Sequence, residues 1–253
     1  LATVMFSNIG GTATMIGDPP NIIIGAALSS SGLEGEPIAN QSIAFIDFVI
    51  NLLPAVLLVS LPTLWLIRWL DPEGVTGERV RDISLLKKAY PIRDPKGLTR
   101  GGIILGLVII AFFAHSAFHH PLLTVAVISL AGALVMLLVT HPHKIEEQLD
   151  KVEWTTLVFF AALFILIHSL EAMGLIAAIA DGTSWIIRSA PDGNARLVVA
   201  LLLLLWVSGI ASAFIDNIPY TATMVPVIII LAKDPNLGLE LAPLAWALAL
   251  GAC

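Results

Sequence analysis

Four long apolar runs predict transmembrane helices. They cover residues 43–70, 101–119, 121–140 and 154–172. Each is close to the ~20 residues that a helix needs to cross the hydrocarbon core of a bilayer. We therefore expect an all-α, polytopic membrane protein.

A polar segment near the start of the chain breaks this pattern in a way that ordinary loops do not. Residues 7–25 (SNIGGTATMIGDPPNIIIG) place glycines, prolines and one carboxylate between apolar flanks too short to span a bilayer alone. Glycine opens backbone conformations that other residues avoid, and proline removes an amide donor, so no continuous helix is expected there. The backbone groups freed by such a break need polar partners within the membrane. In transporters the partner is commonly an ion or a polar solute.

A second interruption, residues 208–226 (SGIASAFIDNIPYTATMVP), lies inside a long apolar run whose flanks each look shorter than a full span. This arrangement predicts a re-entrant hairpin that carries Asp216, Asn217 and Pro219 to mid-membrane depth. Helix ends that meet at such a tip direct their partial charges at a bound ion.

Both interruptions contain the pattern Asn-Ile-x-x-Thr-Ala-Thr-Met, at residues 8–15 and 217–224. The pattern indicates either amides and hydroxyls that share one site, or small and hydroxyl residues that let helices pack closely. Asp18 and Asp216 are the strongest candidates, because a carboxylate at bilayer depth is costly unless it is protonated or paired with a cation such as Na⁺. Alternatively, one of them caps a half-helix. The candidate ion- and solute-binding residues are Asn8, Gly10, Gly11, Thr12, Thr14, Asp18, Asn21, Ser212, Asp216, Asn217, Thr221 and Thr223.

Composition and charge support a membrane location and suggest an orientation. Apolar residues make up 57% of the 253 and charged residues 13%, which would expose too much apolar surface in a soluble protein. The polar linker 71–100, with Arg68 at its edge, holds eight of the thirteen lysines and arginines, and such residues are retained on the cytoplasmic side. The connection 29–42 has two glutamates and no basic residue, so we expect it outside.

Two further features shape these expectations. Residues 174–190 are amphipathic and interrupted by Asp181 and Gly182, which predicts a helix along the outer interface. The chain begins at Leu1 rather than Met and ends inside an apolar run. We therefore expect residues 1–253 to be a single transmembrane transporter domain that is truncated at both ends.

Three segments carry a resemblance to a known family: NIGGTATMIGDPPNIIIG (8–25), SAFIDNIPYTATMVPVI (212–228) and, more loosely, VEWTTLVFFAALFIL (152–166). On these segments the sequence resembles the arsenite permeases and Na⁺/H⁺ antiporters, a family that includes the melanosomal P protein. The family lies within the ion transporter superfamily of citrate transporter-like proteins.

The resemblance implies two inverted repeats, each with a re-entrant hairpin and a broken helix, in a homodimer that works by an elevator-like motion. Residues 7–25 would close the first repeat, the linker 71–100 would join the repeats, and residues 208–226 would form the second hairpin tip. Related dicarboxylate transporters have Ser-Asn-Thr and Gly-Thr-Pro-Pro-Asn where this chain has Asp216-Asn217-Ile218 and Gly17-Asp18-Pro19-Pro20-Asn21. The added carboxylates disfavour an anionic substrate and favour a cation or a proton.

The resulting hypothesis is a secondary active transporter, an antiporter or a symporter, coupled to Na⁺ or H⁺ and moving inorganic ions or a small solute such as arsenite. Its partners are then the lipid bilayer and that solute, and no enzymatic activity, cofactor or nucleic-acid partner is expected. A citrate or dicarboxylate transporter, a channel and an intramembrane aspartyl protease are the alternatives. The protease is disfavoured because Ile215 rather than Tyr precedes Asp216, and Ile16-Gly17 precedes Asp18 in place of Gly-x-Gly.

Overall fold

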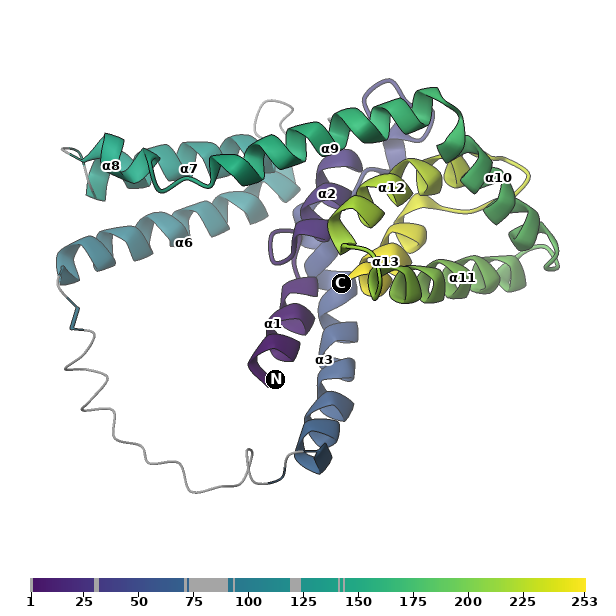
Figure 1. The fold of residues 1–253 in the computed structure, drawn as a ribbon, viewed down its shortest axis with the longest axis horizontal. Helices are drawn as coiled ribbons and strands as arrows, with labels where there is room; N and C mark the ends of the chain where they lie inside the picture. Colours follow the sequence, from purple (N-terminus) through teal and green to yellow (C-terminus); the bar gives the residue numbers. More distant parts are fainter. Residues whose placement is uncertain are drawn as a thin grey trace. The chain divides into compact units, whose positions relative to one another are not determined.

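The structure is a computed structural model that describes residues 2–29, 32–70, 72, 91–92, 94–118, 124–140, 142 and 144–253. Regular structure in these residues is helical, which confirms the all-α prediction (Figure 1). The helices are α1 (Ala2–Thr12), α2 (Pro19–Ala27), η1 (Ala39–Gln41), α3 (Phe45–Leu70), α6 (Pro95–Phe118), α7 (Val125–Thr140), α8 (Ile145–Leu149), α9 (Trp154–Ala172), α10 (Leu175–Arg188), α11 (Asn194–Ser212), α12 (Asn217–Lys233) and α13 (Leu241–Ala252).

Four helices are long and apolar enough to cross a membrane, namely α3, α6, α9 and α11. Three of them coincide with predicted spans, and α7, at 16 residues, is shorter than the predicted run 121–140. Large apolar side chains on these helices are exposed, for example Leu58 at 73% and Ile165 at 70%. Such surfaces suit contact with lipid rather than water. The chain is a multi-pass integral membrane protein.

The helix α6 begins six residues before the predicted span, inside the predicted linker 71–100. Asp94 Oδ1 accepts a hydrogen bond from Gly97 N at 2.9 Å, so it caps the helix. Pro95 takes the first helical position, where its missing amide hydrogen costs nothing. Most of the linker, including residues 73–90, lies outside the described residues, so its cytoplasmic location stays a prediction.

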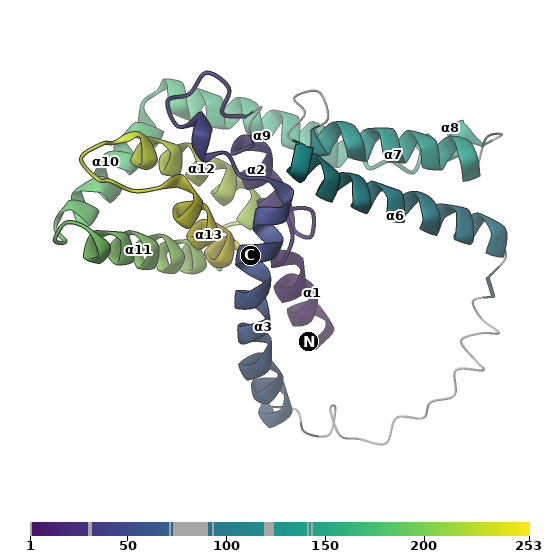
Figure 2. The ribbon, with the colours of Figure 1, turned by 180° about the vertical axis from the view of Figure 1, so that it is seen from behind.

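The chain divides into two compact units. One unit comprises Leu58–Val152 and is built on α6 packed against α7. The other comprises Thr3–Leu57 and Glu153–Cys253 and contains both predicted interruptions. In that unit α13 packs against α11, α12 and α2, and α12 packs against α2, α10 and α9 (Figure 2). The helices α12 and α13 therefore form its core.

The most extensive helix contact in this unit is that of α11 with α13, and glycine allows the two backbones to approach closely. A Cβ atom added to Gly251 would lie 2.6 Å from the Leu205 carbonyl oxygen and 2.6 Å from Ser208 Cβ. Backbones that approach this closely are typical of small-residue helix contacts in membranes. The contact fixes where the end of α13 lies.

We expect Gly251→Ala to destabilise the protein by about 1–3 kcal/mol, because an overpacked contact forces the backbones apart. The matched control is Gly209→Ala, whose added Cβ would be 3.7 Å from the Gly251 oxygen, an ordinary contact. Thermal unfolding of the full-length protein in detergent compares the two variants. Equal melting temperatures would contradict the close approach.

The helix predicted within residues 174–190 is present, since α10 runs from Leu175 to Arg188 and continues through Asp181 and Gly182. Burial of Ile176, Ala180 and Ile187 outweighs the cost of one glycine, about 1 kcal/mol. One sequence-based expectation about this unit is wrong. The flank before residue 216 is not short, because α11 has 19 residues and could span a membrane.

Candidate functional site

The first predicted break is confirmed, because α1 ends at Thr12 and α2 begins at Pro19. The two prolines at the start of α2 lack the amide hydrogens that would continue α1. Between the helices the backbone closes on itself at two glycines. A Cβ atom added to Gly11 would lie 2.7 Å from the Gly17 carbonyl oxygen, so the turn excludes a side chain there.

Asn21 holds this turn together. Its Nδ2 atom donates hydrogen bonds to the carbonyl oxygens of Thr12 and Thr14, at 2.9 and 3.0 Å. The Thr12 carbonyl ends α1 and has no amide of a continuing helix to pair with, whereas the Thr14 carbonyl also accepts a hydrogen bond from Gly17 N at 3.2 Å. Asn21 is fully buried, so its side chain replaces the water that the Thr12 carbonyl would otherwise need. The side-chain amide of Asn21 therefore stabilises the turn between α1 and α2.

The end of α13 reaches the same turn, which the sequence did not reveal. Cys253 Sγ lies 3.7 Å from Asn21 Oδ1. The same thiol is within hydrogen-bonding reach of the Asp18 carboxylate and the Thr12 hydroxyl. Asp18 precedes α2 but makes no capping hydrogen bond, so its carboxylate faces this cluster rather than the helix end. We call Thr12, Asp18, Asn21 and Cys253 the α1–α2 cluster.

The second interruption separates α11, which ends at Ser212, from α12, which begins at Asn217. Asp216 Oδ1 accepts a hydrogen bond from Ile218 N at 3.0 Å and so caps α12. Pro219 lies in the first turn, where no amide donor is needed. The alternative expectation, that one of the two aspartates caps a helix, is therefore confirmed for Asp216.

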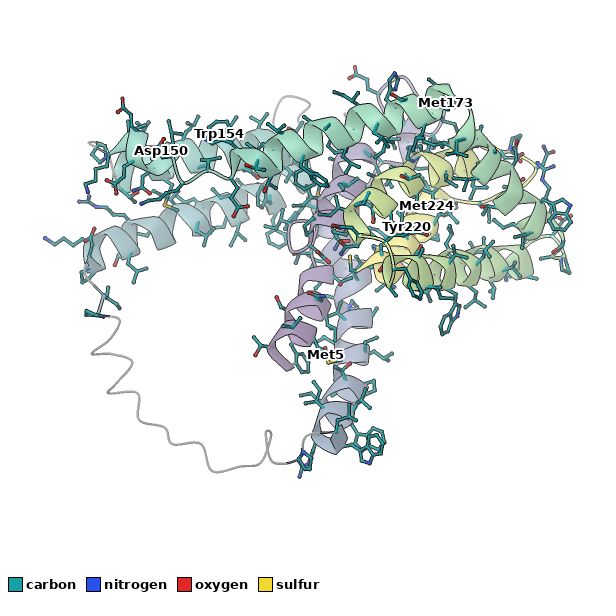
Figure 3. All side chains as sticks on the ribbon, in the orientation of Figure 1. Met5, Asp150, Trp154, Met173, Tyr220 and Met224 are labelled. Carbon is teal, nitrogen blue, oxygen red and sulfur yellow. The ribbon has the colours of Figure 1, made fainter. Side chains whose placement is uncertain are left out.

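Hydrogen bonds link the second interruption to the α1–α2 cluster. Ser212 Oγ donates to the carbonyl oxygen of Ala252 at 3.2 Å, directly before Cys253. Ser208 Oγ and the Tyr220 hydroxyl lie 3.0 Å apart and join the two arms of the hairpin; Tyr220 is labelled in Figure 3. Through the end of α13, both interruptions therefore belong to one polar region.

Thr221 adds an unusual group to this region. Its side chain is fully buried, and Oγ1 has no hydrogen-bond partner among the described residues. The equivalent threonine of the first pattern, Thr12, bonds the Asn8 carbonyl oxygen at 3.0 Å instead. A buried hydroxyl without a partner is costly, so Thr221 is a candidate ligand for a bound ion or solute.

The predicted site residues, all of which the structure describes, differ in their exposure to solvent. Thr12, Asn21 and Thr221 are buried, and Asn8, Gly10 and Asp216 are exposed. The remaining ones are partly exposed, namely Gly11, Thr14, Asp18, Ser212, Asn217 and Thr223. The sequence analysis did not identify Cys253, Ser208 and Tyr220 as site residues. A polar or small residue within or beside an apolar helix was the only sign of them.

Comparison with known proteins gives a consistent result over the whole chain. The profile of the citrate transporter family matches residues 1–251. The P protein of Sus scrofa is 34% identical over this chain's full length, which covers 37% of the P protein. An uncharacterized transporter of Mycobacterium tuberculosis is 37% identical, and a 46 kDa membrane protein of Mycobacterium leprae is 36% identical; the chain covers 54% of each.

The chain thus spans between about a third and about half of the length of these relatives. No solved structure matches it. The profile match, which leaves out only the last two residues, and the relatives agree with a helical membrane protein. The chain belongs to the citrate transporter family of the ion transporter superfamily.

Proposed function

We propose that the chain is part of a secondary active transporter coupled to Na⁺ or H⁺, of the arsenite permease or Na⁺/H⁺ antiporter type. The coupling ion binds at the α1–α2 cluster, with Asp18 as its charged ligand. The homodimer implied by the family resemblance is part of this proposal. The observation that carries it is the convergence of two helix breaks at one polar region, as transporters use to bind ions within the membrane.

Charge supports a cation rather than an anion. The N-termini of α2 and α12 contribute about +0.5 charge each, and the C-termini of α1 and α13 about −0.5 each, so the helix dipoles roughly cancel. No positive side chain from these segments compensates the carboxyl groups of Asp18 and Asp216, because residues 2–29, 197–232 and 241–253 contain no lysine, arginine or histidine. A tricarboxylate would be repelled here, whereas a cation or a proton would be attracted.

The test uses the full-length protein that contains this chain, reconstituted into proteoliposomes with an internal pH dye. An imposed Na⁺ or Li⁺ gradient that changes the internal pH supports antiport. Solute uptake that follows a Na⁺ or H⁺ gradient without antiport supports symport. Transport that responds to neither gradient, in protein that is correctly folded by size-exclusion chromatography, overturns the proposal.

A citrate or dicarboxylate transporter is the second candidate, and the match to the citrate transporter family is what favours it. It requires cations to screen the two carboxylates before the anion binds. In the same proteoliposomes, uptake of radiolabelled citrate under a Na⁺ or H⁺ gradient distinguishes this candidate from the first.

A further inference from the structure

A cavity lies beside α13, and none of the residues of the α1–α2 cluster lines it. Its volume is about 830 Å³, and it is lined by the segment before α3, the start of α3, one face of α11 and one face of α13. We call it the α13 groove. On α13 it follows residues 240, 243, 247 and 250 and so extends along the whole helix.

One end of the groove is polar and acidic. Asp47 and Asn51 line it from α3, four residues apart and therefore on one helix face. Glu240 lines it from the start of α13 but does not cap that helix, because Gln41 Oε1 accepts the hydrogen bond from Leu241 N at 2.6 Å. The Glu240 carboxylate has no hydrogen bond or ion pair with any described residue, so it is available to a ligand.

Asp47 and Asn51 are only partly engaged. Asp47 Oδ2 accepts a hydrogen bond from Ala44 N at 2.8 Å, which leaves the charge of the carboxylate without a cationic partner among the described residues. Asn51 uses Nδ2 to donate to the Asp47 carbonyl oxygen at 2.8 Å, and its own Oδ1 is not needed for that bond. Oxygen atoms of this kind are what alkali and alkaline-earth cations select.

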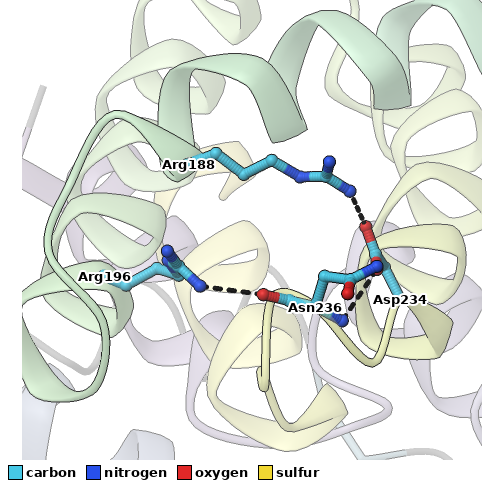
Figure 4. Close-up of polar contacts among 4 residues, drawn as sticks. All are labelled: Arg188, Arg196, Asp234 and Asn236. Atoms are coloured by element: carbon cyan, nitrogen blue, oxygen red, sulfur yellow. Dashed lines mark hydrogen bonds and ion pairs between the residues drawn. The ribbon is translucent and has the colours of Figure 1, made fainter.

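The three basic residues of this unit do not neutralise the groove, because each is paired with another acid. Arg188 binds Asp234, and Arg196 binds the Asn236 carbonyl oxygen at 2.8 Å (Figure 4). Arg196 also pairs with Asp192, and Lys233 pairs with Glu36. Hydrogen bonds from the Asn236 backbone and from Arg188 lower the pKa of Asp234, so its pair with Arg188 persists at neutral pH. None of these three basic residues therefore pairs with the acids of the groove.

The other end of the groove lies next to the polar region of the site. Leu205 and Leu250 line this end. Gly251, the next residue, packs against the Leu205 carbonyl, and Ala252 accepts the hydrogen bond from Ser212. Between the two ends, Trp246 supplies an aromatic wall, a surface that also attracts cations.

We propose that the α13 groove is the route by which a hydrated cation reaches the ion site, with Asp47 and Glu240 capturing it at the mouth. This inference rests on the proposed function, and it adds an entry path and two residues that select for charge. A cleft lined by one sign of charge with low-dielectric walls raises the local concentration of the opposite ion. Such capture acts on the concentration dependence of transport and not on its maximal rate.

The first experiment measures initial transport rates of the full-length protein against Na⁺ concentration in proteoliposomes. We expect Asp47→Asn combined with Glu240→Gln to raise the half-saturating Na⁺ concentration about fivefold, a modest part of the range that steering can give, with an unchanged maximal rate. The difference should shrink in high choline chloride, because salt screens exposed charges.

The matched control is Glu34→Gln together with Asp181→Asn. It removes two charges that form no ion pair with the described residues and that do not line the groove. A similar rise in this control would show a general surface potential and overturn the role of the groove. Wild-type Na⁺ dependence in the Asp47 and Glu240 variant would overturn it as well.

A second measurement does not depend on transport. Asn51→Cys is treated with cationic and anionic methanethiosulfonate reagents, with the unsubstituted protein as the blank. We expect the cationic reagent to react about tenfold faster, and the preference to vanish when Asp47 and Glu240 are neutralised. Equal rates, or no reaction with either reagent, would contradict an open cation route.

The two measurements separate the failure of this inference from the failure of the proposed function. Cation-dependent transport without a charge preference at Asn51→Cys would refute the groove alone. A charge preference without cation-dependent transport would refute the proposed function, and with it the groove as a route for the coupling ion.

Discussion

Asp18→Asn is expected to lower the apparent affinity for the coupling cation about 100-fold or more and to abolish gradient-driven transport. A carboxylate about 4 Å from a cation contributes about 4 kcal/mol near a protein surface, and the neutral amide loses most of this attraction. Asp18 carries the only carboxyl group among the side chains of the α1–α2 cluster, so no neighbour replaces it. Counterflow of ²²Na⁺ or the pH-dye signal in proteoliposomes measures the effect.

The matched control for that prediction is Asp216→Asn. Asp216 caps α12 and is exposed, and asparagine caps a helix as well as aspartate does. We therefore expect less than about a tenfold loss from this variant, mostly through the weaker long-range field. A loss as large as that of Asp18→Asn would place the ion at the hairpin tip, against the present assignment.

Gly17→Ala is expected to unfold the turn between α1 and α2. An added Cβ atom would lie 2.8 Å from Thr14 Oγ1 and closer still to the carbonyl oxygen of Gly11, which is backbone and cannot rotate away. We expect a cost of at least about 3 kcal/mol, the upper end of the range for overpacking. Thermal unfolding in detergent and loss of cation-driven transport should report the damage together.

Gly10→Ala provides the comparison, because an added Cβ atom there meets nothing within 4 Å. Gly10 lies in the last turns of α1, where alanine is the better helix former by about 1 kcal/mol. Its melting temperature should therefore equal or exceed that of the wild type. If both glycine variants melt alike, the close contact between Gly11 and Gly17 is not needed for folding.

The length of the apolar runs was enough to predict most of the spans. The glycines and prolines of residues 7–25 predicted the first break. The runs 43–70 and 154–172 are long, and nothing inside them competes with a helix. Pro19 and Pro20 prevent α1 from continuing into α2, although Gly10 and Gly11 themselves lie inside α1. Asp181-Gly182 does not interrupt the predicted helix, because tertiary burial of neighbouring side chains in α10 outweighs the local propensity.

The binding role of the predicted site residues stays a prediction, and the contacts among them were not foreseen. Asn21 was expected to bind the ion or solute, yet its amide hydrogens go to the carbonyls of Thr12 and Thr14. Cys253 was not expected to contribute, because it is 232 residues away from Asn21 in sequence and meets it only through the packing of α13. Local pattern identifies groups that need partners, whereas tertiary packing decides which partner each one finds.

Thermal unfolding of the purified full-length protein, against Na⁺ concentration and pH at constant ionic strength, tests whether the α1–α2 cluster binds a cation. We predict that Na⁺ or a lower pH raises the melting temperature of the wild type, because a ligand that binds only the folded state at 100 times its Kd adds about 2.7 kcal/mol. Asp18→Asn should abolish that shift. A melting temperature that rises with choline citrate instead, and does so equally in Asp18→Asn, would contradict a cation site at Asp18.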